Sequence, residues 1–183
     1  MLTRFVFVVL VFLSANAFAG KIEHASVAHK DGVYTLALSV LIAARLDPVH
    51  KIVTDYDELH RISDTLIETK RLSEPDAEEI QRRLVVRTCV LVFCFTATMT
   101  EDVVEGDDAI ITTIIPEHSD YKSGETRWEV SAVDETHSRI SLFCELEPDF
   151  WIPPVVGPYL LKRKMMSIAK KTIVNIETLA NDA

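Results

Sequence analysis

The 183-residue sequence lacks the short motifs that mark many enzyme active sites. It contains no Gly-x-Ser-x-Gly, no His-Glu-x-x-His, no Cys-x-x-Cys and no glycine-rich phosphate loop. Its six histidines are scattered, and His50 and His60 are too far apart for one metal-binding helical face, which needs a spacing of three or four residues. We therefore expect no catalytic set, no metal site and no cofactor.

Positive charge is also scarce, because 19 Lys and Arg residues stand against 28 Asp and Glu residues. Nucleic-acid affinity depends on clustered Lys and Arg, so the composition argues against a nucleic-acid partner. The exception is a basic cluster near the C-terminus, made of Lys162, Arg163, Lys164, Lys170 and Lys171. We interpret it as the solvated face of an amphipathic helix, with transient docking on anionic lipid as the alternative.

The N-terminal apolar run, Phe5 to Leu13, is much shorter than the ~20 residues of a transmembrane helix. It follows Arg4 and precedes the small residues Ala17 and Ala19, which is typical of a secretory signal with cleavage after Ala19. We expect residues 1–19 to be a signal peptide and the mature chain to begin at Gly20. The protein should then be secreted or periplasmic, where thiols can oxidise.

Only three cysteines are present, and two of them, Cys89 and Cys94, bracket the apolar run 90–93. If these four residues turn the chain, the two side chains can meet across a hairpin, whereas a single strand would point them to opposite faces. We expect a Cys89–Cys94 disulfide and a buried free thiol at Cys144. The apolar run itself is core if it folds inward, and a membrane or partner contact if it is exposed.

The mature sequence contains one early strand, a short helix, a series of strands and a long helix. Residues 20–31 are a polar lead-in, and residues 33–43 alternate larger apolar with smaller or polar residues, which predicts a strand. A short helix follows, capped by Asp47 with Pro48 at its first position, and ends near Arg61. Six further strands are expected near 64–72, 79–88, 91–103, 109–116, 125–134 and 138–147, and a long helix from Pro158 to about Asn181.

Several stretches are similar to a known superfamily. They are VTDYDEL (Val53 to Leu59), Trp128 within ETRWEV, SRISLFCELEPDFWIPP (Ser138 to Pro154) and the terminal helix. Together with the element order, they resemble the START-like (SRPBCC) superfamily of helix-grip proteins, in the branch of polyketide cyclases and coenzyme Q-binding proteins. The resemblance covers about Gly32 to Ala180, although Asp64 stands where many relatives have a proline.

The resemblance implies an α+β helix-grip fold for a single domain at residues 32–183. Its curved, seven-stranded antiparallel sheet would surround the long C-terminal helix, with a short helical insertion after the first strand. A strongly twisted sheet cannot lie flat on a straight helix, so space is enclosed between them. Pro153 and Pro154 would force the sharp swing from the last strand into the helix.

The enclosed space is the predicted ligand site. We expect Trp128, Leu142, Met165 and Ile168 to wall it, and Phe150 and Trp151 to close one end, unless these two aromatics only seal the core.

Three functions fit these predictions. The first is a carrier for a lipid, quinone or similar hydrophobic molecule; the second is a cyclase-like enzyme that orients an apolar substrate; the third is a protein-interaction module. A nearly bare apolar wall would favour carriage, and several converging polar groups would favour catalysis.

Overall fold

The computed structural model describes residues 20–74, 77, 79–90, 93–107, 109–152 and 157–182. The expected signal peptide, residues 91–92 of the apolar run, and Pro153 and Pro154 of the predicted corner lie outside the described residues.

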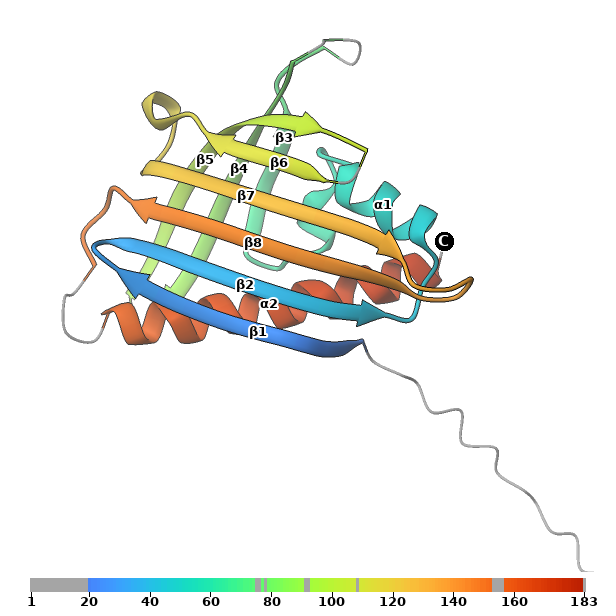
Figure 1. The fold of residues 1–183 in the computed structure, drawn as a ribbon. Coiled ribbons are helices and arrows are strands. Elements are labelled where there is room, and N and C mark those ends of the chain that lie inside the picture. The colour runs from blue at the N-terminus through green and yellow to red at the C-terminus, as the bar shows by residue number, and fades with distance from the viewer. Residues whose placement is uncertain are drawn as a thin grey trace, which may run out of the picture.

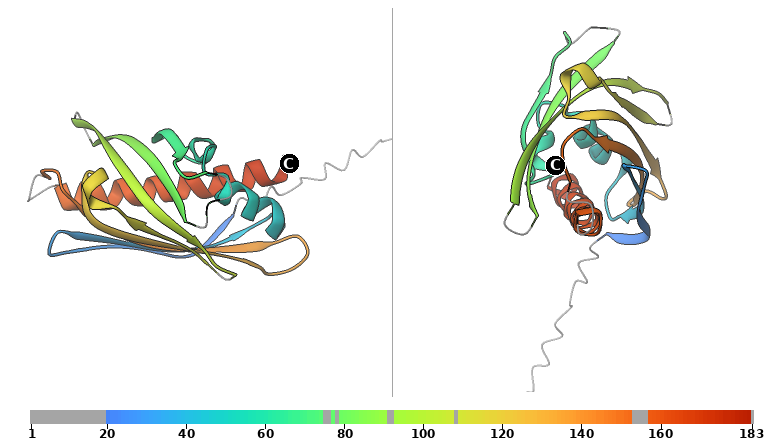
Figure 2. Two further views of the ribbon diagram at one scale, coloured as in Figure 1. Left: turned by 90° about the horizontal axis from the view of Figure 1, so that it is seen from above. Right: turned by 90° about the vertical axis from the view of Figure 1, so that its left-hand side faces the viewer.

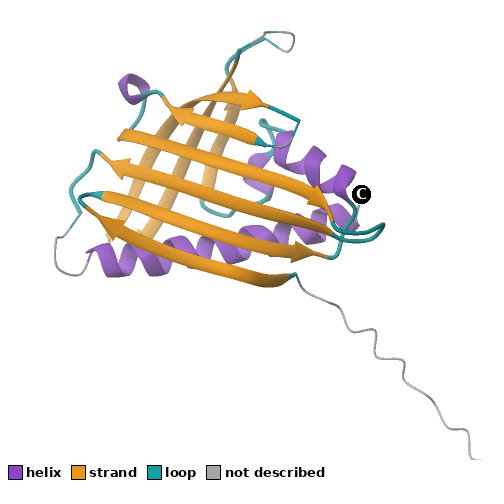
Figure 3. Cartoon of the chain, in the orientation of Figure 1, coloured by secondary structure: helices purple, strands orange, loops and turns teal. Residues whose placement is uncertain are grey.

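One antiparallel sheet curves around a long helix (Figure 1, Figure 3). The strands are β1 (Lys21–Lys30), β2 (Val33–Ile42), β3 (Leu66–Arg71), β4 (Ile80–Val90), β5 (Phe93–Glu105), β6 (Ile110–Ile114), β7 (Tyr121–Ala132) and β8 (Ser138–Pro148). The helices are α1 (Leu46–Thr54), α2 (Gly157–Asn181) and the 3-10 turns η1 (Leu59–Arg61) and η2 (Pro116–His118). The strand order β1-β2-β8-β7-β6-β5-β4-β3 places β2 beside β8, so that the two ends of the domain meet in the sheet.

The prediction of six strands after the short helix and of a long terminal helix is confirmed, but the total of seven strands is wrong. The polar lead-in forms an eighth strand, β1, which pairs with β2 along its whole length. Asp31 and Gly32 both have positive φ, 51° and 90°, as a two-residue hairpin turn requires. Among the hydrophobic side chains of β1, only Ala25 and Val27 are partly buried and pack against the core. This explains the weak hydrophobic pattern of the strand.

The short helix α1 begins at Leu46, two residues earlier than predicted. Arg45 occupies the N-cap position without a side-chain cap bond, so the prediction that Asp47 caps the helix is wrong. Asp47 and Pro48 instead lie in the first turn, where a carboxylate is favoured by the helix dipole and proline is tolerated. The helix ends at Thr54, and Leu59 to Arg61 form the separate turn η1.

Helix α2 lies in the concave side of the sheet (Figure 2). Its C-terminal half buries Ala169, Ile173, Ile176 and Ala180 in the main hydrophobic core. Two hydrogen bonds also connect this half of the helix to the rest of the domain. The Asn175 amide donates to the Ile62 carbonyl at 3.1 Å, and the Ala43 N–H donates to the Glu177 carboxylate at 3.1 Å. Among the described residues, no helix is long and apolar enough to cross a membrane.

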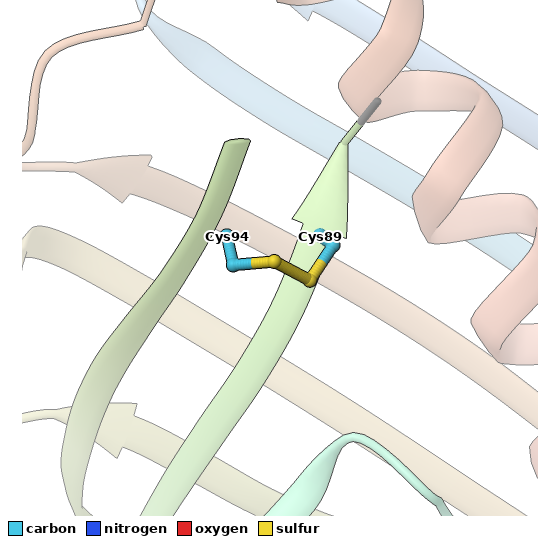
Figure 4. The surroundings of a disulfide bond; sticks show 2 residues. All are labelled: Cys89 and Cys94. Carbon is cyan, nitrogen blue, oxygen red and sulfur yellow. A yellow bond between two sulfur atoms is a disulfide. The ribbon is translucent and has the colours of Figure 1, made fainter. Parts of the chain in front are cut away.

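Cys89 and Cys94 form a disulfide at the end of the β4–β5 hairpin (Figure 4). They are directly opposed in the register, with Cα atoms 3.9 Å apart. Cys144 is buried and has a free thiol.

Removing this disulfide should lower the free energy of unfolding modestly. The bond closes a loop of only five residues in sequence separation, so the chain-entropy model assigns it about 2 kcal/mol. Urea denaturation of Cys89→Ser/Cys94→Ser should show this loss. Adding reductant should lower the free energy of unfolding of wild type by the same amount and should not change that of the variant. Equal unfolding midpoints for the oxidised wild type and the variant would contradict the expectation.

Candidate ligand-binding cavity

A cavity of about 280 Å³ lies between α2 and the sheet. Because alternate strand residues face the same side, β2, β4 and β8 contribute every second residue to its wall, such as Leu36 and Leu38 of β2 or Leu84 and Val86 of β4. Small-molecule sites enclose roughly 300 to 1,000 Å³. At about 280 Å³ this cavity lies just below that range, and its wall suits one small molecule held mainly by apolar contacts.

Four of the five residues predicted to contact a ligand lie in this wall. They are Trp128 of β7, Leu142 of β8, and Met165 and Ile168 of α2. The fifth, Trp151, does not line the cavity, because its side chain is 80% exposed.

An aromatic cluster closes one end of the cavity without Trp151. The ring of Phe150 packs edge-on against Tyr121 and at a tilt against Phe95, with centroid separations of 5.8 and 5.2 Å. Both residues follow the end of β8, where the chain bends. Phe150 lines the cavity and the Trp151 side chain is exposed, so only one of the two aromatics closes this end.

A charged pair that the sequence analysis missed lies beside the cavity. Arg82, which lines the cavity, and Glu101 oppose each other on β4 and β5. Their side chains are joined by a hydrogen bond of 2.8 Å from Nε to Oε2 and are almost fully buried. The guanidinium also lies 5.2 Å from the centre of the Tyr56 ring. The positive charge of Arg82 is thus neutralised within the protein.

The Cys144 thiol and the Tyr34 and Tyr121 phenols in the wall are held in their protonated forms. Burial raises the pKa of the Cys144 thiol to about 11. Burial also raises the pKa of the Tyr34 and Tyr121 phenols above the usual value. With these raised pKa values, the thiol and the two phenols are poorly suited to proton transfer near neutral pH, and no histidine is among the described residues of the lining.

A second hollow, of about 460 Å³, adjoins the cavity where β3 and β4 approach α2. Three positive residues line it: Arg87 of β4, and Lys164 and Lys171 of α2. Five residues line both spaces: Ser63, Thr65, Thr88, Lys164 and Ile168. The apolar cavity therefore meets a cationic hollow at a shared boundary, a feature that the sequence analysis did not predict.

A curved antiparallel sheet, a long C-terminal helix and a cavity between them define a protein of the helix-grip class. Residues 42–163 match the model of the family described as polyketide cyclase / dehydrase and lipid transport, and the chain belongs to this family. The resemblance found in the sequence is thereby confirmed. A search of curated proteins found no match.

Solved structures share this fold at low sequence identity. A START superfamily protein from Mycobacterium smegmatis is 17% identical with a TM-score of 0.63, and the match covers 79% of this chain and 98% of that one. The Zhui aromatase/cyclase from Streptomyces sp. R1128 is 14% identical with a TM-score of 0.57, covering 82% and 93%. A STAR-related lipid transfer protein from Xanthomonas axonopodis is 13% identical with a TM-score of 0.59, covering 86% and 98%.

Proposed function

We propose that this protein binds a hydrophobic small molecule in the cavity between α2 and the sheet and carries it without changing it chemically. The observation that carries the proposal is the apolar wall, in which Trp128, Leu142, Met165 and Ile168 lie together. Burial of apolar surface is a non-directional driving force that suits lipids and quinones. Methionine adapts its unbranched, polarizable side chain to ligands of different shape.

The polarity of the cavity favours carriage over a cyclase-like reaction. Arg82 is neutralised by Glu101 at 2.8 Å, and the Cys144 thiol and the tyrosine phenols keep their protons at neutral pH. A general acid or base works best when its pKa lies near the working pH. The thiol and the phenols do not meet this condition, so orientation of a substrate is the main contribution to catalysis that they leave to the described wall.

We further propose that the carrier works outside the cytoplasm, after cleavage following Ala19. Three features support this proposal: the signal-like pattern of residues 1–19, the disulfide between Cys89 and Cys94, and the surroundings of Gly20. A methyl group added at Gly20 would lie 2.8 Å from the Glu177 carboxylate. An amino terminus created by cleavage would therefore lie beside a buried negative charge.

Native mass spectrometry of protein purified from its own compartment should detect a complex with one hydrophobic ligand. The polypeptide mass is expected to correspond to a chain that begins at Gly20 and has lost two hydrogens to the disulfide. Organic extraction should release the ligand, and the extracted protein should then take up one equivalent of a fluorescent fatty acid. A ligand-free protein that also takes up no hydrophobic probe would contradict the carrier proposal.

A further inference from the structure

The boundary between the apolar cavity and the cationic hollow suggests what kind of ligand the protein binds. Lys164 and Thr88 line both spaces. The lysine side chain combines an aliphatic stem with a charged end and commonly places the stem on apolar surface. A ligand that fills the cavity and extends past Lys164 would pass from apolar contacts directly into a positively charged environment.

The three positive groups of the hollow outnumber Asp64, the one carboxylate among its described lining residues. Among the described residues, no ion pair within 4 Å involves Arg87 or Lys164. Lys171 has one partner, Asp64, at 3.9 Å, and both of these side chains are more than two-thirds exposed. Such a long, exposed pair contributes little energy. A local excess of positive charge therefore remains, in a protein whose formal net charge is −9.

A polar side chain at the boundary also lacks a partner. Thr88 is 6% exposed, and its hydroxyl makes no hydrogen bond with any part of the chain that the structure describes. Buried hydroxyl groups are usually hydrogen-bonded, so the Thr88 hydroxyl is available to donate to a ligand that reaches the boundary. Charged oxygens are the strongest acceptors for hydroxyl and ammonium donors.

We propose that the ligand is an amphipathic lipid with an anionic headgroup, a carboxylate or a phosphate. Its apolar chain occupies the cavity, and its headgroup lies in the hollow against Lys164 and Arg87, within reach of the Thr88 hydroxyl. This inference rests on the proposed carrier function and adds the chemical class of the ligand.

The test compares three probes that share one fluorescently labelled alkyl chain and end in a carboxylate, a phosphate or an alcohol. Wild type is expected to bind the two anionic probes about tenfold more tightly than the alcohol, as charge-assisted hydrogen bonds imply. Arg87→Gln/Lys164→Gln should remove this preference, so that this variant binds the three probes with equal affinity. The carboxylate and phosphate probes together distinguish a fatty acid from a phosphorylated lipid.

Lys170→Gln is the matched control, because it removes one positive charge from α2 at an exposed position that lines neither space. This variant should bind all three probes like wild type. Asp64→Asn, which removes a negative charge from the hollow, should strengthen binding of the anionic probes. Raising the salt concentration should lower the affinity for the two anionic probes and not for the alcohol, because salt screens partly exposed charges.

The outcomes separate the two proposals. If none of the probes binds, the carrier function is wrong. If all three bind with equal affinity, the cavity binds lipids but the anionic headgroup is wrong. If Arg87→Gln/Lys164→Gln binds the monomeric probes like wild type and loses only its attachment to anionic vesicles, the hollow is a membrane-docking surface and the inference is overturned. Thermal unfolding of each variant verifies that it remains folded.

Discussion

Replacing Glu101 by glutamine is expected to lower the free energy of unfolding by about 3–5 kcal/mol. The substitution keeps the side-chain shape but leaves the guanidinium of Arg82 buried without a counter-charge. Arg82 and Glu101 are 6% and 3% exposed, so solvent cannot replace the lost partner. Domains of ordinary size have a total stability of about 5–15 kcal/mol. The single change should therefore remove a large share of the stability.

Two comparisons isolate the cause of this loss. Arg82→Met/Glu101→Leu removes both charges and should recover most of the stability, because well-packed apolar residues often replace buried ion pairs without penalty. Glu68→Gln breaks the exposed pair between Glu68 and Arg83, at 3.9 Å, and should cost less than about 1 kcal/mol. Urea denaturation at neutral pH measures all three. A Glu101→Gln variant as stable as Glu68→Gln would show that the buried pair does not contribute as argued.

Replacing Met165 by glutamate is expected to abolish uptake of an uncharged hydrophobic probe. Met165 lines the cavity and is packed against the core from a half-buried position. A carboxylate there would either lose its hydration against the apolar ligand, which is costly for an unpaired charge, or remain hydrated and occupy the space of the ligand with water. Both arrangements disfavour binding. Leu142→Glu should have the same effect from the opposite wall, since Leu142 belongs to β8.

The measurement is titration with the fluorescent alcohol, which avoids any effect of headgroup charge. Met165→Leu preserves the volume and polarity of the wall and should bind like wild type. Circular dichroism and thermal unfolding identify variants that lose binding only because they fail to fold. A folded Met165→Glu variant with wild-type affinity would rule out the cavity as the binding site.

The fold was predictable from the sequence wherever periodicity was strong. The alternation of Tyr34, Leu36 and Leu38 places one face of β2 in the core, and that pattern alone defines the strand. Strand β1 lacks the pattern because it is an edge strand, and the larger part of its surface is exposed. Its best signal is the dipeptide Asp31-Gly32, which favours a hairpin turn.

The site was predictable only in its apolar part. A helical stripe and an alternating strand suffice to locate Met165, Ile168 and Leu142. The pairing of Arg82 with Glu101 depends on the register of two strands, although Arg82 shares a face with Leu84. The hollow depends on α2 packing beside β4, which brings Lys164 near Arg87. No local pattern encodes a contact between segments so far apart in the sequence.

The pairing of β2 with β8 also affects how the chain can fold. Thr35 of β2 reaches Glu145 of β8 across 110 residues, and β8 is the strand that joins the β1–β2 hairpin to the rest of the sheet. Closing a segment of that length costs entropy before any contact compensates for it, so folding rates fall as such contacts increase. The β1–β2 hairpin must remain without its neighbour until β8 has been synthesised. Completion of the sheet is therefore a late event in the folding of the domain.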